Sequence, residues 1–98
     1  MKTSTTNAMY RYEVPLTEGP TIIEMSAGPI VAAACVERGV ADYAMEFWAE
    51  HDGETMQRLF AVHGTGHPIT INARHCATAP RTPDGLVFHL FELMGKIT

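Results

Sequence analysis

The chain of 98 residues is long enough for one compact domain and too short for two. Apolar residues make up 46% of the sequence, which argues against general disorder. The formal charge of −4 comes from 11 acidic and 7 scattered basic residues, so we expect no contact with nucleic acid. No apolar run approaches the about 20 residues of a membrane-spanning helix, so we expect no contact with a membrane either.

Residues 1–8 are polar and lack the apolar segment of a secretory signal, so we predict a disordered tail on a cytoplasmic protein. A single β domain is expected from residue 9 to residue 94. Cys35 and Cys76 lie in apolar surroundings and form no Cys-x-x-Cys pair, which argues against zinc fingers and thioredoxin-type motifs. Both thiols are expected to be reduced and to pack as small apolar side chains.

Turn residues divide the rest of the chain into seven short segments with the composition of β-strands. Residues 30–37 include three alanines that would suit a helix, but the flanking Gly28-Pro29 and Arg38-Gly39 favour a strand. The sequence therefore predicts an all-β fold with little or no helix, an antiparallel meander that forms a small barrel or sandwich. The expected strands are 10–14, 21–25, 30–37, 43–50, 56–63, 73–80 and 86–93.

Two turns are specified by their residues. Asp52-Gly53 is a strong hairpin signal and predicts that strand 43–50 pairs with strand 56–63. Thr82-Pro83-Asp84-Gly85 has proline and glycine where a type I turn favours them, so a turn is expected before the last strand.

Several of these strands are apolar on both faces, whereas a half-exposed strand alternates between apolar and polar residues. Strand 86–93 is the clearest case, and Trp48 lies on the face of its strand that carries glutamates. Because one small domain cannot cover both faces, we expect a homo-oligomer, with a dimer favoured. The alternative is that Trp48 and Phe88 belong to the core. The candidate interface residues are Glu46, Trp48, Phe88 and Leu90.

Two glycines, two histidines and a proline gather in the loop His63–Pro68. This loop is not a Walker loop, because no Gly-Lys-Ser/Thr follows, and Ile69 stands where a dinucleotide-binding fingerprint has its third glycine. We expect the glycines to serve backbone geometry. The alternative is a small-molecule, metal-binding or hydrolytic site at this loop. Its candidate residues are His63, Gly64, Thr65, Gly66 and His67.

The sequence carries no accepted metal or catalytic signature. Ser26 lies in Met-Ser-Ala-Gly and not in a nucleophile elbow, and His75 and Cys76 would point to opposite faces of a strand. The loop histidines are spaced for a helix that their glycines and proline forbid, so we expect no metal, no cofactor and no enzymatic activity. The side chains weighed as zinc ligands are His63, His67, His75, Cys76 and His89.

Four motifs carry a resemblance: Tyr-Arg-Tyr-Glu-Val-Pro at 10–15, Glu-Phe-Trp-Ala at 46–49, Phe-x-Val-x-Gly-Thr-Gly-His-Pro at 60–68 and Val-Phe-His-Leu-Phe-Glu at 87–92. Through them, most of residues 9–93 resemble a family of small proteins from phages and prophages of actinobacteria, the mycobacteriophages in particular. The family has no assigned activity, so the resemblance implies no catalytic residue. It implies a phage accessory protein in the host bacterial cytoplasm that contacts and modulates a host protein, or alternatively a minor virion component.

Overall fold

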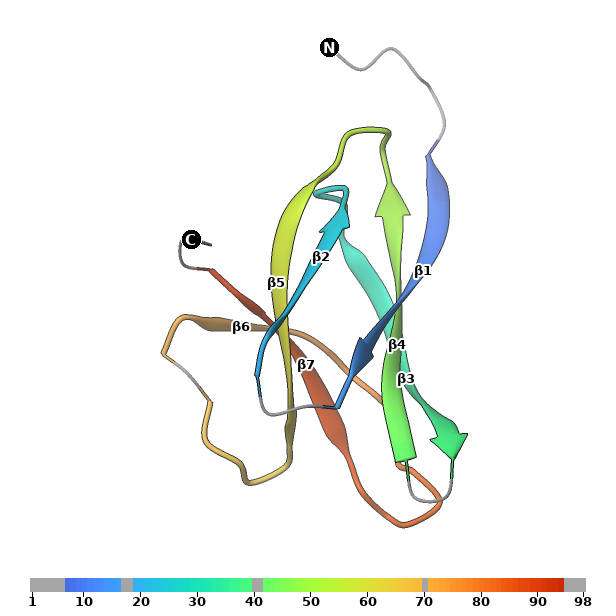
Figure 1. Cartoon of the computed structure of the whole chain (residues 1–98), viewed down its shortest axis with the longest axis vertical. Helices are drawn as coiled ribbons and strands as arrows, with labels where there is room; N and C mark the ends of the chain where they lie inside the picture. Colours follow the sequence, from blue (N-terminus) through green and yellow to red (C-terminus); the bar gives the residue numbers. More distant parts are fainter. Residues whose placement is uncertain (1–6, 17–18, 40–41, 70, 95–98) are drawn as a thin grey trace.

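A computed structural model of the chain describes residues 7–16, 19–39, 42–69 and 71–94. Its seven strands form two antiparallel sheets, ordered β1-β4-β3 and β2-β5-β7-β6, and the described residues contain no helix (Figure 1). The expected all-β class is confirmed. The strands are β1 (Ala8–Pro15), β2 (Thr21–Met25), β3 (Ile30–Gly39), β4 (Asp42–His51), β5 (Met56–Gly64), β6 (Ala73–Thr78) and β7 (Phe88–Leu93).

The N-terminal expectation falls mostly outside the described residues, because these begin at Asn7. Strand β1 already includes Ala8, which stands opposite His51 of β4. The side-chain amide of Asn7 also donates a hydrogen bond to Glu50 at 3.3 Å.

The alanine-rich segment is strand β3, as expected, and its small side chains have a packing role. Ala32, Ala33 and Ala34 stand opposite Trp48, Phe47 and Glu46 of β4. Cross-strand neighbours share the space above one face of a sheet, so small residues on β3 leave room for large ones on β4.

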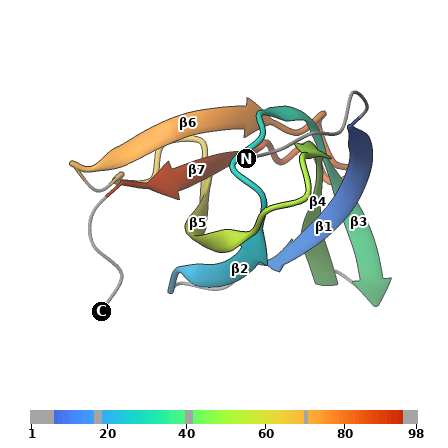
Figure 2. The same cartoon turned by 90° about the horizontal axis from the view of Figure 1, so that it is seen from above.

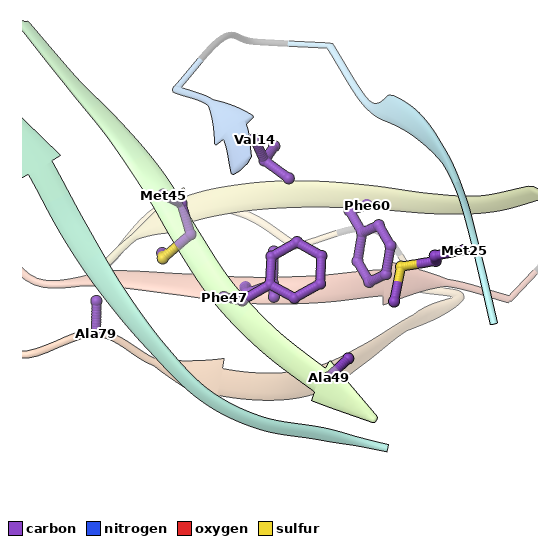
Figure 3. Close-up of a cluster of buried hydrophobic side chains, with 8 residues drawn as sticks. Val14, Met25, Met45, Phe47, Ala49, Phe60 and Ala79 are labelled. Carbon is purple, nitrogen blue, oxygen red and sulfur yellow. The ribbon is translucent and has the colours of Figure 1, made fainter. Parts of the chain in front are cut away.

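The two sheets pack against each other, with β3 near β6 and β1 near β5, and the described strands do not close into a barrel (Figure 2). Phe47 and Phe60 meet across the interior with ring centroids 5.0 Å apart, and both are fully buried (Figure 3). Each such ring contributes roughly 2–3 kcal/mol of burial free energy. The buried cluster consists of Val14, Met25, Met45, Phe47, Ala49, Phe60, Ala79 and Leu90.

The connectivity differs from the expected meander. Consecutive strands pair in the described sheets at β3–β4 and β6–β7, while the chain crosses between sheets after β1, β2 and β4. Asp52-Gly53 does form a turn, with a φ of 96° at Gly53, but the turn joins strands of different sheets. A turn signal fixes a local chain reversal, whereas pairing depends on which apolar faces meet in the core.

The crossing from β2 to β3 is fitted closely onto the end of β4. The Ser26 hydroxyl donates to the carbonyl oxygen of Glu50 at 2.8 Å, and the Gly28 N–H donates to Ser26 Oγ at 3.2 Å. A Cβ atom at Gly28 would lie 2.2 Å from the Glu50 carbonyl oxygen. Glycine is therefore required at this position by space and not by its φ angle.

A buried ion pair links β5 to β7. Arg58 and Glu92 are 5% and 8% exposed, and the guanidinium donates to both carboxylate oxygens at 2.9 and 2.8 Å. Its third nitrogen, Nη1, donates to the carbonyl oxygens of Ser26 and Gly28 at 2.8 and 2.9 Å. Hydrogen bonds from Arg58 hold the pKa of Glu92 below its usual value, against the opposing effect of burial.

Candidate functional site

The loop after β5 is a tight turn that its residue types dictate. Gly66 has a φ of 90°, a backbone conformation that residues with a Cβ atom rarely adopt. The expectation that glycine serves the backbone geometry is therefore confirmed at this position. The Gly64 N–H donates to Nδ1 of His67 at 3.3 Å, and the His67 N–H donates to the Gly64 carbonyl at 3.1 Å. The loop is thus held by its own hydrogen bonds.

Two hollows adjoin this loop. One has a volume of about 420 Å³ and the other about 440 Å³, and both are lined by Gly64, His67 and Phe88. The second is completed by Leu16, Val62, His63 and Pro68. We call the first the Phe88 pocket; besides Gly64 and Gly85, its lining residues are Thr65, His67, Arg81, Leu86, Val87 and Phe88.

A chain of hydrogen bonds runs from the loop across β7 to β6. Thr65 Oγ1 lies 2.8 Å from Nε2 of His89, and Nδ1 of His89 lies 2.9 Å from Oγ1 of Thr78. Thr78 Oγ1 then lies 2.8 Å from Nε2 of His75. A neutral imidazole has one donor and one acceptor, so the bonds of this chain can all point the same way.

Thr65 and His89 have the spacing of a nucleophile and its general base. The third group of this arrangement, however, is the Thr78 hydroxyl, whereas a serine-hydrolase triad uses a carboxylate to stabilise the imidazolium that forms. This series of hydrogen bonds therefore fixes the orientation of the His89 ring. It does not supply the negative charge that activation of Thr65 would need.

Histidine rings cover the outer face of β7. His63 and His75 each contact the ring of Phe91 edge-on, with centroids 5.5 Å apart, and Phe91 is 7% exposed. Phe91, one of the apolar residues expected on the outer face of this strand, is thus covered within one chain. Among the residues that the structure describes, no group of three or more His, Cys, Asp or Glu side chains is placed to hold a metal ion.

A separate surface lies on the outer side of sheet β1-β4-β3. Trp48 is partly buried there between Arg11 of β1 and Ala32 of β3. Arg11 Nη1 donates to Glu46 Oε2 at 2.8 Å, so the glutamate beside Trp48 is paired. We call this surface the Trp48 face; its residues are Arg11, Ala32, Ala34, Glu46 and Trp48.

Comparison with known protein families finds a match over most of the chain. A family model described as a domain of unknown function (DUF7352) matches residues 5–97. The chain belongs to the DUF7352 family. No curated protein and no solved structure matches it. The DUF7352 description names no activity.

The interface candidates of this DUF7352 domain are separated by the fold. Leu90 is fully buried in the core, which corrects its assignment to an interface: it shares the inner face of β7 with Phe88. Phe88 packs against the core and also lines both hollows. Glu46 and Trp48 remain together on the outer surface. No helix in the described ranges is long and apolar enough to span a membrane.

The edge strands of the DUF7352 domain differ in how well they are protected from pairing with a strand of another molecule. Strand β1 carries Arg11 and Glu13 and ends at Pro15, β2 has five residues, and β6 is interrupted by a register shift after His75. Charges, prolines, bulges and short lengths all discourage edge pairing. Strand β3 has ten residues and carries neither charge nor proline from 30 to 36, although its register shifts near both ends.

Sequence reasoning missed Thr78 and Arg81 as site residues. A signal for Thr78 existed: Thr78 and His89 are each five residues from the Pro83-Asp84 turn, and residues equidistant from a hairpin turn stand opposite each other. Arg81 directly precedes that turn, but no sequence pattern says that the turn approaches the loop after β5.

Proposed function

We propose that this domain acts by protein–protein contact, with a partner strand added to the edge of β3 and partner side chains covering the Trp48 face. The observation that carries the proposal is the uncharged edge from 30 to 36, which adjoins the only tryptophan of the chain. Strand addition uses the free backbone groups of an edge for affinity, and neighbouring side chains give specificity.

The size of the surface favours this combined mode over contact with the face alone. A ten-residue strand rises about 3.3 Å per residue and strands lie about 4.8 Å apart, so three strands present roughly 500 Å². A stable interface buries about 800 Å² on each partner. Contact with the face alone would therefore be weak, and pairing at β3 supplies the missing area and hydrogen bonds.

We further propose that the domain is a phage accessory protein that acts on a host protein in the bacterial cytoplasm. The resemblance to small actinobacteriophage proteins supports this context. The hydroxyl in place of a triad carboxylate, beside Thr65 and His89, favours a binding role over a hydrolytic one.

The test is quantitative affinity purification from an actinobacterial lysate with wild type, Trp48→Ala and Leu59→Ala. Leu59 is partly buried and lies on the outer side of the other sheet, so its truncation is a matched control. Buried tryptophans at interfaces contribute about 2 kcal/mol or more, so Trp48→Ala should weaken capture by about 30-fold.

Leu59→Ala should capture the same protein as wild type, and circular dichroism should show that both variants are folded. Equal recovery of the same proteins by wild type and Trp48→Ala would contradict the proposal.

A further inference from the structure

The Phe88 pocket has the size and lining of a small-molecule site. Its volume of about 420 Å³ lies within the range of ligand pockets, roughly 300–1,000 Å³. Leu86, Val87 and Phe88 supply apolar surface, and the polar side chains are those of Thr65, His67 and Arg81. Ligand sites combine an apolar lining with a few polar groups in this way.

Arg81 differs from the other arginines of the described chain. Arg11 and Arg38 bind Glu46 and Glu13 on the Trp48 side, while Arg58 and Arg74 share Glu92. Arg81 forms no ion pair with the described residues. It is also the one charged side chain among the pocket-lining residues, since the pocket contains no carboxylate.

The turn that follows Arg81 is held by hydrogen bonds within the chain. Thr82 is buried, its hydroxyl accepts a hydrogen bond from the Leu86 N–H at 3.0 Å, and its own N–H donates to the Leu86 carbonyl at 2.9 Å. Asp84, the nearest carboxylate in the sequence, accepts a hydrogen bond from the Tyr43 hydroxyl at 2.9 Å. Asp84 is therefore engaged on another element and leaves the charge of Arg81 uncompensated.

His67 is a second lining residue with a side chain that can donate a hydrogen bond. Its Nδ1 accepts the hydrogen bond from the Gly64 N–H, so the neutral ring carries its proton on Nε2. An arginine fork and one imidazole N–H match the two oxygens of a carboxylate.

We propose that the Phe88 pocket binds small monocarboxylates with an apolar chain or ring. The carboxylate pairs with Arg81 and accepts a hydrogen bond from His67, and the apolar part lies against Leu86 and Phe88. This site uses the loop after β5 and the turn before β7, whereas the proposed protein contact uses β3 and β4. The two proposals therefore fail or succeed independently.

The experiment titrates the full chain with hexanoate, hexanol and hexylamine, which share one apolar tail and differ in the head group. Binding is followed by NMR chemical shifts of the backbone amides of Thr65, His67 and Gly85. Hexanoate should bind, hexanol should bind about tenfold more weakly because it lacks the charge-assisted hydrogen bonds, and hexylamine should bind most weakly of the three.

Arg81→Gln should weaken hexanoate about tenfold and leave hexanol unchanged, because the lost interaction is specific to the carboxylate. Arg11→Gln removes the same charge from the Trp48 face and should bind hexanoate like wild type. Equal affinity for the three head groups, an equal loss in Arg11→Gln and Arg81→Gln, or no shift at these amides with hexanoate would each overturn the proposal.

Discussion

At the scale of single residues, the buried carboxylate of Glu92 binds two arginines, Arg58 and Arg74. Its carboxylate accepts two hydrogen bonds from Arg58 and a third from Arg74 at 2.9 Å. Burying charges is costly, and the cost is recovered only when the pair is complete and well hydrogen-bonded. The pair is complete here, and its net contribution to stability is modest. Removing one partner lowers stability by more than this contribution, because the other charge is left buried and unpaired.

We expect Glu92→Gln to lower the free energy of unfolding by about 3 kcal/mol or more, because the guanidinium of Arg58 stays buried without a carboxylate. Urea denaturation followed by circular dichroism measures this loss. The matched control is Glu13→Gln, which breaks the exposed pair with Arg38 and should change stability much less. Equal losses in the two variants would contradict this account of the buried pair.

The same pair makes stability depend on pH. Because the hydrogen bonds from Arg58 lower the pKa of Glu92 in the folded state, the stabilisation is complete above the usual pKa of 4.5. It is lost as the pH falls below 4.5 through the lower folded-state pKa. Wild type should therefore lose stability on acidification over this range, and Glu92→Gln should lose less. Parallel pH profiles for the two proteins would show that Glu92 is not the titrating group.

At the scale of elements, the crossing between β2 and β3 packs tightly against the end of β4. Gly28→Ala should lower the free energy of unfolding by about 3 kcal/mol, since a Cβ 2.2 Å from a backbone oxygen forces the crossing away from β4. Thermal and urea denaturation measure this change. The control Gly19→Ala adds a Cβ that meets no atom within 4 Å beyond its chain neighbours, so it should change stability much less than Gly28→Ala.

The strands themselves follow from local pattern, while their pairing does not. The alternation that places Met45 and Phe47 on one face of β4, and Trp48 on the other, is the arrangement in the structure. Asp52-Gly53 and Pro83-Asp84 are comparable turn signals, yet the first joins two sheets and the second closes a hairpin. Both turns satisfy the same backbone demands, so only the long-range packing of the core distinguishes them.

In the candidate sites, too, features set by sequence neighbours were predictable, whereas features set by long-range packing were not. The backbone requirement for glycine at position 66 was predictable, because it depends on neighbours in sequence. The Phe88 pocket was not, because it forms where this loop meets the separate turn that carries Arg81. The burial of Leu90 in the core could not be predicted either, because a strand that is apolar on both faces does not reveal which face is inside.

At the scale of the whole molecule, we expect a dimer of this chain to form at the edge of β3, where a second copy would compete with the proposed partner strand. Antiparallel pairing of two β3 strands would join the sheets β1-β4-β3 of two copies about a two-fold axis, with one surface serving on both sides. The expectation of a dimer thus depends on β3 and the Trp48 face, because the histidines already cover the outer side of β7.

Sedimentation equilibrium at tens of micromolar should show a dimer for wild type. Ala32→Lys places a charge on the β3 edge strand and should give a monomer, since lysine on an edge opposes strand addition. Ala27→Lys makes the same change in the exposed crossing outside β3 and should remain dimeric. A wild-type monomer at this concentration would exclude the second copy as a partner and leave the proposed contact with a host protein to its own test.

The strand order also bears on how the chain folds during its synthesis. Strand β7 is an interior strand of its sheet, between β5 and β6, and it contributes Leu90 to the core. While a ribosome is still synthesising residues 88–93, β5 therefore lacks a neighbour and the core lacks one of its buried side chains. Topologies with such distant pairings fold in about milliseconds to seconds. We therefore expect the nascent chain to complete its fold only after β7 has been synthesised, and to stay accessible to chaperones and proteases until then.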